Sequence, residues 1–222
     1  MKPAIVFDLD GTLIDSVPDL AAAVNLTLTA RGLPELDLTT IIGFVGNGLP
    51  KLVERVMTHG GVDMGLHSKL TRITLDNYMR APTARTVLYA GVRDMLEAFT
   101  TSGNALGICT NKPEAAARQV LDALDLSRFF AVVVGGDTLA QRKPDPAPLL
   151  HVFEQLGAGP RFYVGDSEVD AETAQRAGVP FALFTEGYRK SPVASLPHQL
   201  AYADSGTLPA LIADALTDPA TR

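Results

Sequence analysis

The sequence predicts an α/β fold in which a doubly wound parallel sheet forms a Rossmann-like core and carries an inserted α-helical cap domain. Three observations support this fold class. Short apolar runs are continuous rather than alternating, which is typical of strands buried on both faces of a parallel sheet. Helical patterns alternate with these runs, and one long helical interval interrupts the alternation. The predicted strands are Ala4–Phe7, Ala105–Cys109, Ala131–Val134, Arg161–Val164 and Phe181–Phe184.

Amphipathic helices are predicted after most of these strands, because apolar residues recur there every three or four positions. The helices cover Gly91–Thr101, Pro113–Leu124, Pro146–Leu156 and Glu168–Ala177. The last is followed by Gly178, a residue type that commonly ends a helix. Strands and helices that alternate in this way predict a sheet with helices on both faces.

The interval from Ser16 to Arg85 contains helical patterns and no convincing strand. One apolar helical face runs from Leu20 to Leu28, a second helix fits Leu49–Met57, and a third is predicted at Ser68–Met79. The glycine-rich segment Gly43–Gly48 lacks the lysine of a Walker phosphate loop. We expect it to be a loop of the cap that closes over the substrate, or a plain connection between two helices.

These patterns divide the chain into two units. We expect residues 1–15 and 86–222 to form the α/β catalytic core and residues 16–85 to form the helical cap. The segment Ala81–Thr83 is predicted to be the linker that returns to the core, and the tail from Asp218 is predicted to fray.

Composition and charge limit the partners of the protein. The 222 residues carry a formal net charge of −6, which leaves no excess positive charge for binding a nucleic acid or an anionic membrane. No apolar stretch approaches about 18 residues, so no transmembrane helix is predicted. The first apolar run stops at Asp8, too early for a secretory signal, and the single cysteine, Cys109, excludes an intrachain disulfide. We expect a cytoplasmic monomer or homodimer.

The first predicted strand ends in two aspartates, Asp8 and Asp10, which are followed by Gly11. Residues two apart on an extended chain project to the same face at a spacing of roughly 7 Å. Two carboxylates placed in this way can act as a nucleophile and as a general acid and base. An Asp-Gly turn that closes a hairpin is the alternative. It is disfavoured because two aspartates at the end of an apolar strand repel each other and need a cation.

A second acidic pair, Asp166 and Asp170, follows the strand predicted at Arg161–Val164. Ligands bind beyond the carboxyl ends of the strands in such a sheet, so Asp166 could join Asp8 in a Mg²⁺ site with oxygen ligands. Aspartate is also common at helix N-termini, where it caps the first turn. Beside Asp8 and Asp10, the metal interpretation is favoured for Asp166, and both interpretations stay open for Asp170.

Two further segments offer groups that suit a phosphate. Thr110 and Asn111 lie between a strand and a helix, where a hydroxyl and the free N–H groups of the helix can cradle a phosphate. Helix capping is the alternative for both residues. Lys143 precedes Pro144 and Pro146, which restrict the backbone of its loop. A lysine needed at one point suits such a loop, and an ordinary surface lysine is the alternative.

With these residues assembled, the chain resembles the haloacid dehalogenase superfamily of phosphatases. The four motifs of the superfamily appear in order as Asp8-Leu9-Asp10-Gly11-Thr12, Thr110-Asn111, Lys143-Pro144 and Gly165-Asp166-Ser167-Glu168-Val169-Asp170. The predicted cap between the first two motifs is similar to that of the phosphoglycolate phosphatase branch. This narrower resemblance also includes Val45-Gly46-Asn47-Gly48, Tyr89-Ala90-Gly91-Val92 and Glu186-Gly187-Tyr188, although the branch often has proline where Ala90 stands.

The resemblance implies roles for the residues of the first three motifs. Asp8 would be the nucleophile that becomes an aspartyl-phosphate, and Asp10 would protonate the leaving group and then activate water. Dehalogenases lack an aspartate at the position of Asp10, so its presence points to phosphate esters. Thr110, Asn111 and Lys143 would bind the phosphoryl oxygens.

The resemblance also implies a Mg²⁺ cofactor. Asp8, Asp166 and the backbone carbonyl of Asp10 would bind this ion. Asp170 would orient Lys143 or a metal-bound water.

The implied activity is the Mg²⁺-dependent hydrolysis of a phosphate monoester, 2-phosphoglycolate or a similar small phosphorylated metabolite. A sugar phosphate, a nucleotide or pyrophosphate stays open as the substrate. The alternative outside enzymes is a phospho-acceptor signalling domain, which also combines aspartates, a threonine and a lysine around Mg²⁺. In such receiver domains, however, the phosphorylated aspartate lies on a later strand and no helical cap interrupts the fold.

Overall fold

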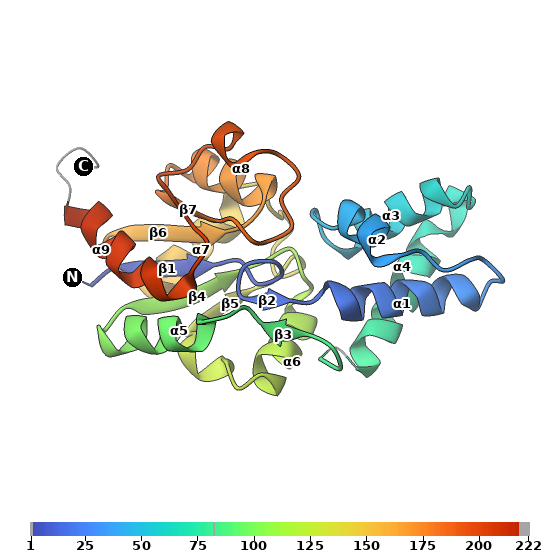
Figure 1. Ribbon diagram of the computed structural model, residues 1–222, viewed down its shortest axis with the longest axis horizontal. Coiled ribbons are helices and arrows are strands. Elements are labelled where there is room, and N and C mark those ends of the chain that lie inside the picture. Colours follow the sequence, from blue (N-terminus) through green and yellow to red (C-terminus); the bar gives the residue numbers. More distant parts are fainter. Residues whose placement is uncertain (1, 82, 218–222) are drawn as a thin grey trace.

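The computed structural model describes residues 2–81 and 83–217, and its centre is a parallel sheet of six strands (Figure 1). The strands lie in the order β5-β4-β1-β6-β7-β8, and every neighbouring pair is parallel. Their bounds are β1 (Ala4–Phe7), β4 (Ala105–Cys109), β5 (Val132–Val134), β6 (Arg161–Gly165), β7 (Phe181–Phe184) and β8 (Leu200–Tyr202). Along the chain, β4 and β5 are added on one side of β1, and β6, β7 and β8 are then added on its other side. In sheets of this kind ligands bind where the strand order reverses, and here that point lies beside β1 and β6.

The predicted fold class is confirmed, and the parallel sheet has one strand more than predicted. β8 was missed because it is a three-residue edge strand in which Ala201 is exposed and Leu200 is half-buried. An edge strand has one neighbour and does not need a continuous apolar run. Two strand bounds also differ by one residue: β5 begins after Ala131, and β6 extends to Gly165.

Helices cover both faces of the sheet. Their bounds are α5 (Val92–Thr101), α6 (Glu114–Ala123), α7 (Ala147–Leu156), α8 (Glu168–Ala177) and α9 (Leu208–Thr217). Side chains of α5, α6 and α9 pack on one face of β1 with Ile5 and Phe7, whereas those of α7 and α8 pack on the other face with Ala4 and Val6. The helix α9 was not predicted from the sequence. In the described part of the chain, no helix is both long and apolar enough to span a membrane.

A helical insert lies between the first and second strands of the sheet. It contains α1 (Val17–Thr29), α2 (Leu38–Phe44), α3 (Leu49–His59) and α4 (His67–Arg80), which share a hydrophobic core of their own. The short helix α2 was not predicted; its first turn is capped by Asp37, which accepts a hydrogen bond from the backbone N–H of Thr40. The segment Gly43–Gly48 proves to span the end of α2 and the connection to α3.

Two very short strands flank the insert and were also missed by the sequence analysis. β2 (Ile14–Asp15) and β3 (Val87–Leu88) form an antiparallel ribbon at the point where the chain leaves and re-enters the core. The described residues also form four single turns of 3-10 helix: η1 (Met64–Leu66), η2 (Ser127–Phe129), η3 (Val193–Ser195) and η4 (Ser205–Thr207). Two-residue strands have no periodicity that a sequence pattern could reveal.

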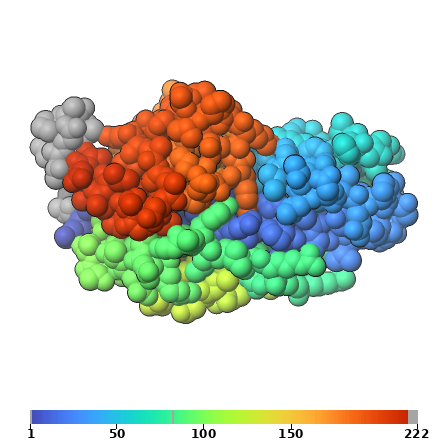
Figure 2. All heavy atoms as spheres, in the orientation of Figure 1, coloured from blue at the N-terminus to red at the C-terminus, as the bar shows by residue number. Residues whose placement is uncertain are grey.

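The insert forms one end of the molecule, beside the carboxyl ends of the central strands (Figures 1 and 2). That residues 16–85 are a separate domain, with 1–15 and 86–222 as the core, stays a prediction. The predicted linker at Ala81–Thr83 includes residue 82, which lies outside the described residues. The predicted frayed tail from Asp218 lies outside them entirely.

The burial of Cys109 at the end of β4 gives a test of this fold. The side chain is fully buried, and burial raises the pKa of its thiol to about 12. Because the thiolate is the reactive form, we expect Cys109 to react with Ellman's reagent at neutral pH only after unfolding in guanidinium chloride. Fast stoichiometric labelling of the native protein would contradict the placement of β4 in the core.

Candidate active site

Asp8 occupies the centre of the carboxyl edge of the sheet. Its backbone N–H donates to the carbonyl of Val164 at 2.8 Å, which extends the pairing of β1 with β6 by one residue. Its Oδ1 lies 2.9 Å from Nζ of Lys143 as an ion pair but is not aligned for a hydrogen bond, so this buried oxygen lacks a hydrogen-bond partner among the described residues. Burial raises the pKa of Asp8 to about 6, although Lys143 opposes this shift.

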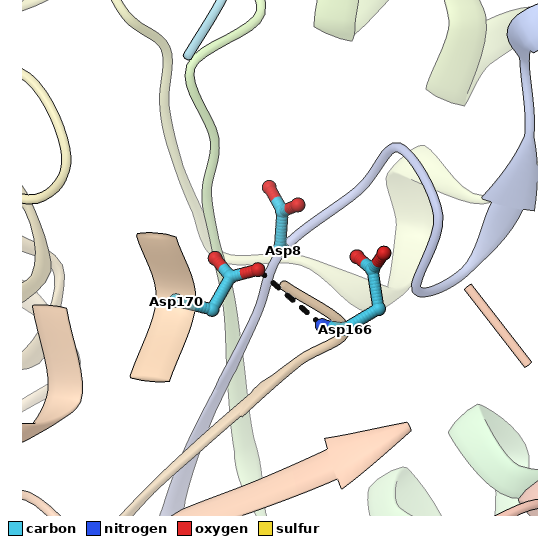
Figure 3. A group of neighbouring side chains, drawn as sticks. All are labelled: Asp8, Asp166 and Asp170. Carbon is cyan, nitrogen blue, oxygen red and sulfur yellow. Dashed lines mark hydrogen bonds between the residues drawn. The ribbon is translucent and has the colours of Figure 1, made fainter. Parts of the chain in front are cut away.

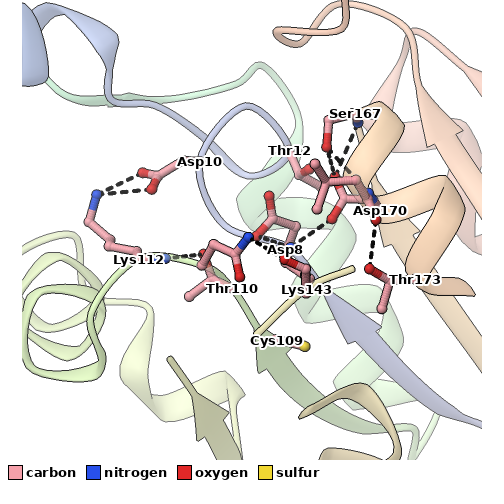
Figure 4. A network of polar contacts seen from close by, with 12 residues as sticks. Asp8, Asp10, Thr12, Cys109, Thr110, Lys112, Lys143, Ser167, Asp170 and Thr173 are labelled. Carbon is pink, nitrogen blue, oxygen red and sulfur yellow. Dashed lines mark hydrogen bonds and ion pairs between the residues drawn. The ribbon is translucent and has the colours of Figure 1, made fainter. Parts of the chain in front are cut away.

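Lys143 is buried between two carboxylates and a phenol. Its Nζ lies 2.7 Å from Oδ1 of Asp170 and forms an ion pair with Asp8 (Figure 4). It also donates to the hydroxyl of Tyr163 at 3.0 Å. Burial by itself lowers the pKa of this lysine, but Asp170 and Asp8 outweigh that effect and raise the pKa above its usual value. Lys143 is therefore a fixed positive charge beside Asp8 rather than a surface lysine.

Asp170 uses both of its oxygens within the protein. Oδ1 accepts from Lys143 and from the hydroxyl of Tyr163 at 2.7 Å, and Oδ2 accepts from Oγ of Ser167 at 2.5 Å and from its N–H at 3.1 Å. Burial raises the pKa of Asp170, but Lys143 and these hydrogen bonds hold the pKa below its usual value. The capping alternative is thus confirmed for Asp170, which forms a capping box with Ser167 at the start of α8. The same carboxylate orients Lys143.

Asp166 faces Asp8 across the edge of the sheet. Its Oδ1 accepts from the hydroxyl of Thr12 at 2.9 Å and its Oδ2 from the N–H of Tyr188 at 2.6 Å. A Cβ atom on Gly11 would stand 2.5 Å from Oδ2 of Asp166, so this close approach of the first loop requires glycine. The capping alternative is wrong for Asp166, because Ser167 is the residue that caps α8.

Asp8, Asp166 and Asp170 form a group suited to a cation. Each offers one carboxylate oxygen, and these oxygens lie within 4.8 Å of one another (Figure 3). Burial, together with Asp170 and Asp8, raises the pKa of Asp166 well above its usual value. Oδ1 of Asp8 accepts no hydrogen bond from the described residues, and this and the mutual repulsion of the carboxylates both fit a divalent cation with oxygen ligands. Of the predicted ligands, the cluster includes Asp8 and Asp166 but not the side chain of Asp10.

The side chain of Asp10 points to a residue for which the sequence analysis had no role. Nζ of Lys112 lies 2.8 Å and 3.1 Å from the two carboxylate oxygens of Asp10, and Oγ of Ser16 donates to the same carboxylate at 2.5 Å. Burial lowers the pKa of Lys112, but Asp10 more than compensates and the pKa lies above its usual value. The ammonium group also lies 4.5 Å from the ring centre of Tyr78 on α4. The only sequence signal was its place directly after Thr110 and Asn111.

Thr110 and Asn111 differ in what they contact. The hydroxyl oxygen of Thr110 accepts from the N–H of Lys112 at 3.2 Å, while Nδ2 of Asn111 donates to the carbonyl of Lys143 at 3.0 Å. Neither side chain caps α6, since Asp137 accepts from the N–H of Glu114 at 2.7 Å in the first turn of that helix. Asn111 therefore supports the loop of Lys143.

One cavity joins these groups to the helical insert. It has a volume of about 350 Å³. Its polar lining includes Asp8, Asp10, Thr110, Asn111, Lys112, Lys143, Asp166 and Ser167 from the core. The insert contributes mostly apolar side chains, among them Leu49, Leu52 and Leu75. A small charged molecule can therefore be enclosed between the carboxylate cluster and the insert.

Divalent cations are expected to stabilise the folded protein, because they offset the repulsion among three buried carboxylates. A ligand at 100 times its dissociation constant adds about 2.7 kcal/mol to the free energy of unfolding, which raises the melting temperature of a chain of this length by roughly 5–10 °C. Differential scanning fluorimetry with and without Mg²⁺ measures this shift. Asp166→Asn should abolish it, whereas Glu172→Gln, which changes a half-exposed acid on α8, the helix that follows Asp166, should preserve it. An undiminished shift in Asp166→Asn would place the ion elsewhere.

Comparison with known proteins agrees with this geometry. Residues 5–184 match the model of the haloacid dehalogenase-like hydrolases. The chain is 46% identical over 212 residues to a phosphoglycolate phosphatase of Cereibacter sphaeroides (strain ATCC 17025 / ATH 2.4.3), covering 95% of this chain and 97% of the relative. It is 40% identical over 214 residues to a phosphoglycolate phosphatase of Rhodobacter capsulatus, covering 96% and 97%. A crystal structure described as a predicted phosphoglycolate phosphatase from Haemophilus somnus 129pt has a TM-score of 0.89 at 29% identity, over 94% of this chain and 97% of the other. The chain therefore belongs to the family of haloacid dehalogenase-like hydrolases.

Proposed function

We propose that this chain hydrolyses 2-phosphoglycolate to glycolate and inorganic phosphate, with Mg²⁺ as its cofactor. The observation that carries the proposal is the environment of Asp8, a buried carboxylate whose Oδ1 accepts no hydrogen bond from the described residues and lies 2.9 Å from the ammonium group of Lys143. Asp8 also lines a cavity whose volume suits a small metabolite. The substrate is supported by the relatives named phosphoglycolate phosphatase, at 40% and 46% identity.

In the first chemical step, Asp8 attacks the phosphorus atom of the ester. The bond between phosphorus and the ester oxygen breaks, and the phosphoryl group is left on the Asp8 carboxylate. Lys143, which is held as a cation by Asp170, neutralises charge on the phosphoryl oxygens. Mg²⁺ would be held by Asp8, Asp166 and the backbone carbonyl of Asp10, and it would supply further positive charge for the phosphoryl oxygens.

Asp10 handles the protons in both steps. It gives a proton to the departing oxygen of glycolate, and it then takes a proton from the water that attacks phosphorus. The bond between phosphorus and the Asp8 oxygen breaks as phosphate leaves, which restores both aspartates. Lys112 and Ser16 hold the Asp10 carboxylate in one orientation throughout. Both contacts are therefore positioning contacts.

The remaining predicted site residues contribute to phosphate binding, either directly or through Lys143. The hydroxyl oxygen of Thr110 already accepts from a backbone N–H, so its proton is available to a phosphoryl oxygen. Asn111 acts through its bond to the carbonyl of Lys143. Asp170 acts through the ammonium group of the same lysine, with no oxygen to spare for the substrate.

We further propose that the protein is cytoplasmic and acts as a monomer or homodimer. The net charge of −6 gives no support for a nucleic-acid partner, and none of the described helices could span a membrane. A phospho-acceptor signalling domain is not supported, because four helices of the insert separate the first and second strands of the sheet and the family is one of hydrolases.

A panel of phosphate monoesters tests the proposed function. We expect 2-phosphoglycolate to give the highest kcat/KM, ahead of a sugar phosphate, a nucleotide and pyrophosphate. Asp8→Asn should lower kcat by at least about 10³-fold, because an amide cannot form the covalent intermediate. Circular dichroism and the melting temperature check that the variant is folded. A clear preference for another ester would overturn the substrate, and near wild-type turnover by Asp8→Asn would overturn the nucleophile.

Lys112→Met is expected to lower kcat for 2-phosphoglycolate by roughly 10- to 100-fold, because Asp10 loses the cation that orients it. The loss should be smaller for p-nitrophenyl phosphate, whose leaving group departs without an acid. Steady-state kinetics on the two substrates measures the difference. Lys51→Met is the matched control, because Lys51 pairs with Glu54 on the insert and does not line the cavity. Equal losses on both substrates would contradict a role through Asp10.

A further inference from the structure

Two cationic side chains line the cavity without belonging to the carboxylate cluster. Arg55 lies on α3 of the insert, and Lys190 lies on the loop that follows β7 in the core. Across residues 2–81 and 83–217, neither side chain forms an ion pair with a carboxylate. Every other cavity-lining lysine is paired, since Lys112 pairs with Asp10 and Lys143 with Asp8 and Asp170.

Arg55 and Lys190 meet at one backbone carbonyl. Nη1 of Arg55 donates to the carbonyl oxygens of Phe44 at 2.7 Å and Val45 at 3.4 Å, and Nη2 donates to Oδ1 of Asn47 at 3.2 Å. Nζ of Lys190 donates to the same oxygen of Val45 at 3.0 Å. All of these acceptors are neutral, and both side chains have donors beyond the ones used here. The two positive charges are thus held side by side with no negative charge between them.

The surroundings of Lys190 show that the pair repels. Burial lowers the pKa of Lys190, and the neighbouring Arg55 lowers it further, although Glu168 opposes the shift. The Glu168 carboxylate is occupied elsewhere, because its Oε1 accepts from the N–H groups of Lys190 at 2.8 Å and Ser191 at 2.6 Å. Two adjacent cations in a partly apolar cavity favour an incoming anion, whose binding relieves their repulsion.

We propose that Arg55 and Lys190 bind a second anionic group of the substrate, the carboxylate of 2-phosphoglycolate. The inference rests on the proposed function and deepens it: the phosphoryl end lies at Asp8 and Lys143, and these two cations select monoesters that carry a carboxylate. The planar guanidinium group of Arg55 suits a carboxylate because two of its N–H groups can donate in parallel. Arg55 comes from the insert and Lys190 from the core, so the subsite is complete only when the insert packs against the core as it does in this structure.

The test compares ligands that differ in the carboxylate alone. 3-Phosphonopropionate and propylphosphonate are non-hydrolysable analogues of the ester with and without that group, and both are expected to compete with the substrate. Ethyl phosphate is the corresponding ester in which a methyl group replaces the carboxylate of 2-phosphoglycolate. Arg55→Met and Lys190→Met should each weaken inhibition by 3-phosphonopropionate at least about tenfold more than inhibition by propylphosphonate. Each should lower the ratio of kcat/KM for 2-phosphoglycolate over ethyl phosphate by a similar factor.

Two further variants separate charge from packing. Lys51→Met removes a cation from the same helix outside the cavity and should keep both wild-type ratios. Arg55→Lys retains the charge and should lose less than Arg55→Met. The hydrogen bonds of Arg55 to Phe44 and Val45 could instead serve packing alone. In that case Arg55→Met weakens inhibition by both phosphonates by the same factor and lowers the melting temperature.

The outcomes distinguish the inference from the proposed function. If the wild-type protein does not hydrolyse 2-phosphoglycolate, the proposed function fails, and the two phosphonates still test the anion subsite against whichever ester is turned over. If it hydrolyses 2-phosphoglycolate but both methionine variants weaken the two inhibitors equally, the subsite is refuted and the proposed function stands. Equal inhibition of the wild-type protein by both phosphonates also overturns the inference.

Discussion

The repulsion among three buried carboxylates is the constraint around which the site is organised. Asp8, Asp166 and Asp170 meet at the carboxyl edge of the sheet, where burial makes each negative charge costly. Lys143 neutralises Asp170 and reaches Asp8, but within the part of the chain that the structure describes Asp166 accepts hydrogen bonds from neutral donors only. The folded chain therefore holds more negative than positive charge at this point. This excess of negative charge favours the binding of a divalent cation, and phosphoryl transfer needs such a cation to neutralise the phosphoryl oxygens.

Tyr188 connects this cluster to the helical insert. Its backbone N–H donates to Asp166, while its hydroxyl donates to Asp15 at 2.7 Å and accepts from the N–H of Ser16 at 2.9 Å. Ser16 in turn donates to Asp10. The residues at which the chain leaves the core for α1 are thus linked by hydrogen bonds to Asp10 directly and, through Tyr188, to Asp166. The position of the insert over the cavity and the orientation of two carboxylates depend on the same few hydrogen bonds.

The sequence predicted the fold best where a local pattern was strong. β1, β4 and β7 have the predicted bounds because each is a continuous apolar run buried on both faces, and α8 does because it has a clear cap and a terminal Gly178. β2, β3, β8 and α2 were missed because each has only two to seven residues and none is a run buried along its whole length. Their stability comes from neighbours that are distant in sequence. The apolar helix α9 was missed although its pattern was present.

By itself, the sequence determined the family and the order of the motif residues, because strand ends and their carboxylates follow from local residue type. It could not assign partners. Only the tertiary structure decided that Asp10 pairs with Lys112, that Asp170 orients Lys143, and that Arg55 reaches the Val45 carbonyl beside Lys190. Apart from the contact of Arg55 with Val45, these contacts join segments far apart in the chain. Their energies depend on burial and distance, which arise only when the insert and the sheet pack together.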